Sequence, residues 1–128
     1  MHQINRSIFN ISSDQLEASK VFYTTLFAFE VAFDSDWYIN LRHADPPVEI
    51  GLLHSNSDLI PDDYPRKNSG GYLTFVVEDV DQVHQLALEK GFRGKQAPED
   101  TFYGQRRMLL LDPNDFLIDV SSLIPARN

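Results

Sequence analysis

Histidine is the side chain that most often does acid–base chemistry near neutral pH, and the sequence has four histidines. They are scattered rather than clustered. His2 is terminal, His43 ends a predicted strand, His54 lies on another strand and His84 lies in a predicted helix. No pair of them has the spacing of a zinc motif. We therefore expect each to be a surface histidine.

The other reactive residue types narrow the chemistry further. The chain has no cysteine, which excludes disulfides, thiolate metal sites and cysteine nucleophiles. It also has no nucleophile elbow and no phosphate-binding loop. Binding chemistry remains. Trp37 is a large rigid platform for stacking, and Arg106 or Arg107 could hold a carboxylate through a planar fork.

Composition indicates one ordinary globular domain, residues 1–128, with 42% hydrophobic and 23% charged residues. The formal charge of −8 argues against nucleic-acid binding, which needs a basic surface. No apolar run approaches the roughly 20 residues that span a bilayer. The N-terminus lacks a signal-peptide pattern. We expect a cytoplasmic protein with no nucleic-acid or membrane partner.

Two stretches share one layout, and the rest of the chain is organised around them. Residues 70–91 predict a strand, an amphipathic helix and a glycine stop, and residues 6–29 follow the same plan. The matching strands begin at Ile8 and Tyr72, which are 64 residues apart in a chain of 128. We therefore predict two copies of one unit, at about 1–55 and 70–124, joined by a polar loop.

In the first half, residues 4–12 are predicted to form a strand, and residues 14–27 a helix that begins with a capping box at Asp14 and Glu17. Leu16, Phe22 and Leu26 recur at helical spacing on its apolar side. Three strands follow, at residues 29–33, 37–42 and 48–54.

In the second half, residues 72–78 form an apolar run that predicts a strand buried on both faces. A second capping box at Asp79 begins a helix that ends at Gly91. A short strand is possible within residues 92–101. Strands at 105–111 and 116–122 flank a turn at 112–115.

Each half is therefore predicted to be a strand, a helix and three strands. The fold class is α+β: two βαβββ modules forming a curved mixed sheet around a cleft. The helix of each module covers one face of its sheet, and the open faces would lie toward the cleft. We expect function to reside there.

The layout and several short sequence motifs resemble the vicinal-oxygen-chelate superfamily, the fold of glyoxalases, bleomycin-resistance proteins and ring-cleaving dioxygenases. Three stretches, which together span most of the chain, show the likeness: LEASKVFYTTLFAFEV, GGYLTFVVEDVDQV and YGQRRMLLLDPNDFLIDV. Two glycines of the family pattern are replaced, by Ala28 after the first helix and by Asp115 in the last turn. Asp can adopt the left-handed conformation at modest cost.

The resemblance implies where a metal would bind, on the first and last strands of each module. Those positions fall at Ile8, Gly51, Tyr72 and Asp119. Isoleucine and glycine offer no side-chain ligand, and a tyrosine phenol stays protonated near pH 7. Asp119 alone is a good hard ligand, and a two-residue slip would add Glu49. Two carboxylates without histidine make a poor transition-metal site, so we expect no metal and no cofactor.

The resemblance also implies a ligand-binding set on the cleft-facing parity of the strands. Tyr103 occupies the place of an aromatic lid. Asp119 could bind a cationic group, act as a base if burial raises its pKa, or form a salt bridge with Arg6 or another basic residue. Tyr72 could instead be a core tyrosine, and Trp37 a core or dimer-interface residue. The predicted ligand-binding residues are Trp37, Tyr38, Asn40, Glu49, Tyr72, Thr74, Tyr103, Arg106 and Asp119.

From this set we predict a metal-independent protein that sequesters a small aromatic or cationic ligand in its cleft. The family likeness implies a homodimer. Two alternatives stay open. One is a metal-dependent lyase, isomerase or dioxygenase of the same superfamily with a displaced site at Glu49 and Asp119. The other is an interaction module with no ligand.

Overall fold

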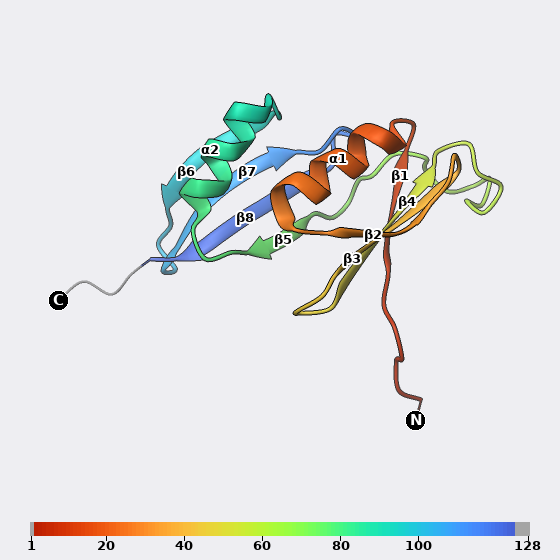
Figure 1. Cartoon of the computed structure of the whole chain (residues 1–128), viewed down its shortest axis with the longest axis horizontal. Helices are drawn as coiled ribbons and strands as arrows, with labels where there is room; N and C mark the ends of the chain where they lie inside the picture. Colours follow the sequence, from red (N-terminus) through yellow and green to blue (C-terminus); the bar gives the residue numbers. More distant parts are fainter. Residues whose placement is uncertain (1, 125–128) are drawn as a thin grey trace. The chain divides into compact units, whose positions relative to one another are not determined.

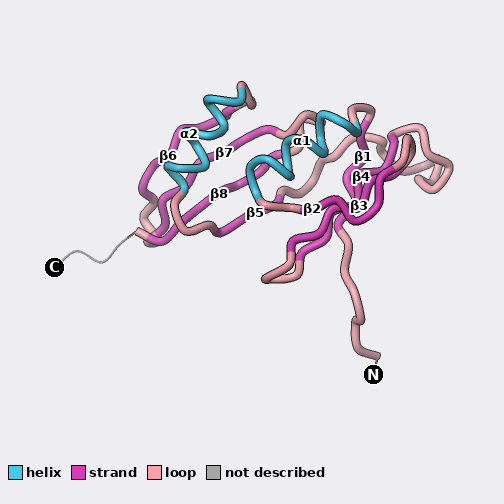
Figure 2. Tube along the Cα trace, in the orientation of Figure 1, coloured by secondary structure: helices cyan, strands magenta, loops and turns pink. Residues whose placement is uncertain are grey.

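The computed structural model describes residues 2–124, and the chain divides after Asn68 into two compact units (Figure 1). Each unit is a βαβββ module with a four-stranded mixed sheet, which confirms the predicted α+β fold (Figure 2). The first unit contains β1 (Phe9–Ser13), α1 (Leu16–Phe27), β2 (Glu30–Asp34), β3 (Tyr38–His43) and β4 (Val48–His54). The second contains β5 (Leu73–Val76), α2 (Val80–Lys90), β6 (Gly94–Asp100), β7 (Gln105–Leu111) and β8 (Leu117–Leu123).

The first sheet has the strand order β1-β4-β3-β2. β1 runs parallel to β4, with Asn10 opposite Gly51, and the other pairs are antiparallel. The first strand begins later than the predicted residue 4. Parallel pairing with β4 starts only where Phe9 meets Ile50, and residues 2–7 are exposed, so no burial holds them in the sheet.

The second sheet repeats this plan in the order β5-β8-β7-β6, with β5 parallel to β8 and Thr74 opposite Asp119. The prediction that β5 is buried on both faces is wrong. Its residues alternate between half-buried and exposed, and Val76 is 62% exposed. An apolar run is typical of a central parallel strand, but β5 lies at the edge of its sheet.

The two helices begin differently. Asp79 caps α2 as predicted, because its side chain accepts hydrogen bonds from the backbone N–H groups of Asp81 (3.0 Å) and Gln82 (3.3 Å). The predicted capping box at Asp14 is wrong. α1 starts at Leu16, and the residue before it, Gln15, makes no side-chain cap. The backbone N–H of Gln15 donates to the Ser13 hydroxyl. Neither helix has the length and apolar run of a membrane span within residues 2–124.

Two positions with left-handed backbone stand where the family pattern has glycine. Ala28 ends α1 with φ 57°, and Asp115 has φ 61° in the last turn. The turn is built around buried Asp112, whose carboxylate accepts the N–H groups of Asn114 (2.8 Å) and Phe116 (2.9 Å). Arg93 pairs with the Asp115 side chain and donates to the Asp112 carbonyl.

Each helix covers one face of its own sheet. α1 packs on β2, β3 and β4, and α2 packs on β6, β7 and β8 (Figure 1). The cores are the strand residues that point to the helices, with the helix residues that meet them: Ile11, Phe22, Tyr23, Ile39, Leu41, Ile50 and Leu52 in the first unit, and Val80, Ala87, Met108, Leu110, Ile118 and Val120 in the second. Burial of each large side chain stabilises the fold by about 1.5–3 kcal/mol.

Because side chains alternate along a strand, the remaining strand residues point away from the helices. We call these two surfaces the first open face and the second open face. The polar and aromatic residues discussed below are Asn10, Tyr38, Asn40, Arg42, Glu49 and Gly51 on the first, and Thr74, Arg107, Asp119 and Ser121 on the second.

Candidate functional site

Glu49 is the electrostatic centre of the first open face. Arg6 donates to both of its oxygens, at 2.7 and 2.6 Å, and Arg42 donates from 3.2 Å. The hydrogen bond from Arg6 is the main cause that lowers the pKa of Glu49 to about 2, with further lowering by Arg42 and Asn40 against the opposing effect of burial. Glu49 is therefore a fixed anion and a poor general base near neutral pH.

Gly51 leaves room for two side chains from neighbouring strands. A Cβ at this position would lie 2.8 Å from the Tyr38 ring and hydroxyl, and closer still to the Asn10 amide oxygen. Asn40 donates to the Tyr38 hydroxyl at 3.3 Å, and its own amide oxygen is buried without a hydrogen-bond partner within residues 2–124. A metal-ligand position of the family is thus covered by the Tyr38 ring and Asn10.

Trp37 and Tyr38 form an aromatic pair at the start of β3. Their ring centroids are 5.5 Å apart, and Phe33 lies 6.3 Å from Tyr38. Trp37 is 46% exposed and Phe33 is 50% exposed. The rings are tilted by 32° and 37° from that of Tyr38, so each exposed ring is a separate apolar face on which a ligand ring could stack.

Asp119 is the centre of the second open face, and it is 7% exposed. Its two oxygens accept from Arg107 Nε and Thr74 Oγ1, each at 3.0 Å. The structure thus agrees with the alternative interpretation of Asp119 as the partner of a basic residue. That residue is Arg107, because Arg6 pairs with Glu49.

Tyr72 and Tyr103 lie beside this ion pair. The hydrogen bond that Arg107 donates to Asp119 is the main cause that raises the pKa of Arg107, and the phenols of Tyr103 and Tyr72 raise it further. Both rings are 54% exposed, so Tyr72 is not a core tyrosine. Next to Arg107 in the β7–β8 ladder, the Ser121 hydroxyl is buried and has no hydrogen-bond partner in the described part of the chain.

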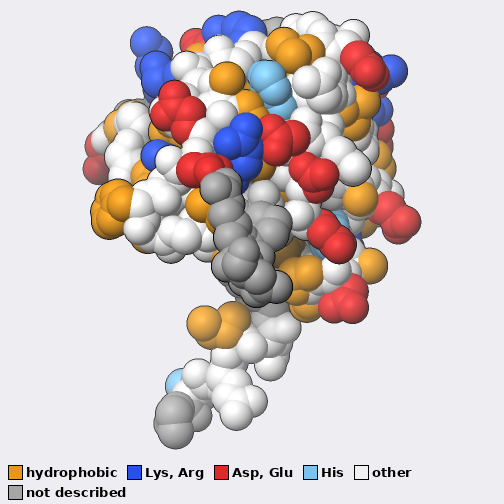
Figure 3. Space-filling view, turned by 90° about the vertical axis from the view of Figure 1, so that its left-hand side faces the viewer, with side chains coloured by type: hydrophobic (Ala, Val, Ile, Leu, Met, Phe, Trp, Pro, Cys, Tyr) orange, Lys and Arg blue, Asp and Glu red, His pale blue; other side chains and the backbone are white. Residues whose placement is uncertain are grey.

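Arg106 does not join the other predicted site residues, because it lies on the helix side of its sheet. It forms ion pairs with Asp81 (2.9 Å) at the start of α2 and with Asp100 (3.1 Å) on β6. These residues line a depression of about 410 Å³ together with Ser122. Seen from the side of α2 and β6, acidic and basic side chains are interspersed (Figure 3).

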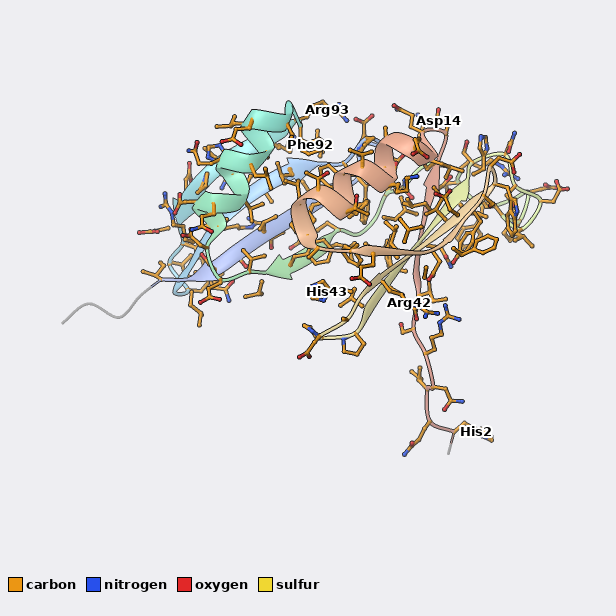
Figure 4. All side chains as sticks on the ribbon, in the orientation of Figure 1. His2, Asp14, Arg42, His43, Phe92 and Arg93 are labelled. Atoms are coloured by element: carbon orange, nitrogen blue, oxygen red, sulfur yellow. The ribbon has the colours of Figure 1, made fainter. Side chains whose placement is uncertain are left out.

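The residues present do not fit a metal ion of the kind the fold implies. The strand pairing sets Asn10 beside Gly51 and Thr74 beside Asp119. The two candidate carboxylate ligands, Asp119 and Glu49, are each already bound by arginine. Residues 2–124 contain no group of three histidine, aspartate or glutamate side chains that could hold a metal. His2, on the segment before β1, and His43, on β3, lie apart (Figure 4).

Of the two arginines considered for holding a carboxylate, the predicted set included Arg106 and left out Arg107, and it missed Ser121 and Arg42. A signal for Arg107 was present. The antiparallel hairpin of β7 and β8 pairs Leu111 with Leu117, so odd-numbered residues on both strands share a face with Asp119. Arg106 was preferred because Gly104-Gln105-Arg106 matches the G-x-R motif of the family resemblance, and the alternation of side chains along the strand was not considered.

The comparisons with known proteins agree with this geometry. Residues 4–120 match the family model of the Glyoxalase/Bleomycin resistance protein/Dioxygenase superfamily. The chain belongs to this superfamily. No curated protein matches it.

Solved structures of the superfamily share the fold at low sequence identity. A glyoxalase/bleomycin resistance protein/dioxygenase family enzyme from Burkholderia phytofirmans PsJN has a TM-score of 0.77 and 22% identity, over 92% of this chain and 98% of that one. The fosfomycin resistance protein FosX from Listeria monocytogenes has a TM-score of 0.73 and 13% identity, over 96% of each chain. Lactoylglutathione lyase from Agrobacterium tumefaciens has a TM-score of 0.67 and 17% identity, over 90% of each chain. Identities this low show a common fold and leave the chemistry of this chain to its own residues.

Proposed function

We propose that this member of the superfamily is a metal-independent binding protein that holds a flat small molecule on its second open face. One observation is the main support. Asp119 is the only good metal ligand among the four family positions, and Arg107 and Thr74 occupy both of its oxygens. The same surface has two half-exposed aromatic rings, Tyr72 and Tyr103, which can stack on a planar ligand.

The test is a thermal-shift screen with planar aromatic molecules of negative, zero and positive charge, each with and without added divalent ions. A ligand that binds only the folded chain raises its melting temperature, by an amount that grows with ligand concentration. We expect at least one planar molecule to do so in the presence of chelator. If none of them stabilises the protein, the proposal is wrong and an interaction module without a ligand becomes the better hypothesis.

The enzyme alternative requires a metal ion to compete with arginine at Asp119 and Glu49. Both carboxylates already have charge-assisted hydrogen bonds, which are about twice as strong as neutral ones. Metal analysis of protein purified without chelator separates the two functions. One divalent ion per chain would favour the superfamily's metal chemistry over simple binding.

A homodimer is part of the same proposal and comes from the family resemblance. Sedimentation equilibrium gives the mass directly. A species of twice the 14.7 kDa chain mass supports the dimer, and a single species at 14.7 kDa across the concentration range contradicts it.

A further inference from the structure

The guanidinium of Arg107 is held in one orientation, but only one of its three nitrogens donates a hydrogen bond within residues 2–124. Its Nε donates to Asp119 at 3.0 Å, and Thr74 holds the other carboxylate oxygen, so the ion pair cannot easily turn. The two terminal nitrogens of the guanidinium make no hydrogen bond or ion pair with any residue in 2–124. With 26% of its side chain exposed, Arg107 still reaches the surface.

Terminal guanidinium nitrogens suit one kind of partner. They are parallel donors with a spacing that matches the two oxygens of a carboxylate. The guanidinium is charged at every working pH. Partial burial reduces solvent screening, so an anion at this position is bound more strongly than on an open surface.

The surroundings of Arg107 favour an aromatic anion over a cation. Tyr72 and Tyr103, which influence the pKa of Arg107, each expose about half of their surface. Each oxygen of Asp119 already accepts one hydrogen bond, and the guanidinium of Arg107 offsets the charge of the carboxylate, so Asp119 attracts a cationic ligand only weakly. Glu99 is the cross-strand neighbour of Arg107 on β6, yet forms no ion pair with it within the described residues.

The Ser121 hydroxyl provides an independent indication of a missing partner. Ser121 is 1% exposed, lies directly across from Arg107 on β8, and its hydroxyl has no hydrogen-bond partner within residues 2–124. Buried polar groups in native proteins are nearly always hydrogen-bonded to protein, water or ligand. A water molecule between this hydroxyl and a bound carboxylate would satisfy it.

We infer that the ligand of the second open face is a planar aromatic carboxylate, whose anion is held by the terminal nitrogens of Arg107 while its ring lies against Tyr72 and Tyr103. This inference rests on the proposed binding function and specifies the ligand class. It also gives the arginine a definite role. Arg107 supplies a fixed positive charge beside Asp119, one of the four family metal-ligand positions.

Isothermal titration with three ligands of one shape tests the charge preference: 2-naphthoate, 2-naphthamide and 2-naphthylmethylamine. We expect 2-naphthoate to bind about tenfold or more tightly than the neutral amide, the size expected for a charged hydrogen bond. The amine should bind no better than the amide. If the amide or the amine binds as tightly as the carboxylate, the inference is wrong but the proposed binding function stands. If none of the three binds, the inference is wrong, and the thermal-shift screen decides separately whether the proposed binding function stands.

Variants at neighbouring arginines test the residue. Arg107→Gln should weaken 2-naphthoate binding about tenfold or more and leave 2-naphthamide binding nearly unchanged. Arg106→Gln is the matched control, since it removes the same group from the opposite face of β7 and should leave both affinities unchanged. Because Arg107→Gln leaves Asp119 unpaired, the double variant Arg107→Gln/Asp119→Asn provides a neutral pair, and thermal melting confirms folding. Full affinity for 2-naphthoate in the folded double variant would overturn the inference.

Discussion

At the scale of single residues, arginine side chains bind the two carboxylates that were the candidate metal ligands. Glu49 and Asp119 are both bound by guanidinium groups, from Arg6 and Arg42 in one unit and from Arg107 in the other. Glu49, whose pKa is lowered by its arginine partners, stays ionised near neutral pH and is a weak proton acceptor. The site residues are therefore suited to holding a ligand in place rather than to moving protons.

The ion pairs of Glu49 should make stability depend on pH in acid. The pKa of Glu49 is about 2 in the folded chain, against an ordinary value of 4.5. Because the folded-state pKa is depressed, the contribution is present above about pH 4.5 and is lost as the pH falls toward 2. Glu49→Gln should show a smaller loss of unfolding free energy across this window in urea titrations.

The cause of this shift can be checked separately. Arg6→Gln removes the largest contribution and should raise the pKa of Glu49 toward its ordinary value, as measured by carboxyl-carbon NMR titration. Identical pH dependence of wild type and Glu49→Gln would contradict the assignment of the acid-side loss to this residue.

Gly51 should tolerate no side chain. Gly51→Ala places a methyl group 2.8 Å from Tyr38 and even nearer to Asn10, so we expect a loss of about 1–3 kcal/mol of unfolding free energy. Gly94→Ala on β6 meets open space and is the control for the same change in a strand. Adding Asn10→Ala should recover part of the loss, and full additivity in this double-mutant cycle would argue against the contact.

At the scale of elements, the ends of helices and turns show how the chain adapts the family pattern. α2 has the expected Asp79 cap and Gly91 stop, with φ 74° at the glycine. α1 ends instead at Ala28, whose Cβ is disfavoured at φ 57°. Asp115 has the same backbone conformation but gains a pairing with Arg93. Only the alanine is left without such compensation.

Ala28→Gly should therefore stabilise the protein. Removal of the Cβ relieves the left-handed strain of roughly 1–2 kcal/mol, and the greater freedom of glycine in the unfolded chain offsets part of it. We expect a net gain of about 0.5–1 kcal/mol in thermal or urea unfolding. Ala18→Gly, inside α1, is the matched control and should destabilise. A loss of stability in Ala28→Gly would contradict the strain.

At the scale of the whole molecule, two units repeat one plan. In each, the first strand runs parallel to the last, and the residues paired across them are Asn10 with Gly51 and Thr74 with Asp119. The repeat has diverged in chemistry. The first unit has a glycine covered by Tyr38, while the second has a buried carboxylate bound by arginine.

The whole protein should be indifferent to divalent metals. We expect the melting temperature to change by less than the experimental scatter when chelator, Zn²⁺, Mn²⁺ or Ni²⁺ is added, because no donor set in residues 2–124 would bind these ions in the folded state. A metal-dependent rise that saturates at one ion per chain would contradict a metal-independent function.

The sequence by itself determined the α+β class, the repeat, most strand positions and the cap and stop of α2. These features depend on local signals, namely alternation along strands, helical spacing, and the conformations of aspartate and glycine. Only the tertiary structure decided that β5 is an edge strand, that Arg6 pairs with Glu49, and that Arg107 rather than Arg106 meets Asp119. These depend on strand order and register, where a shift of one residue moves a side chain to the other face of the sheet.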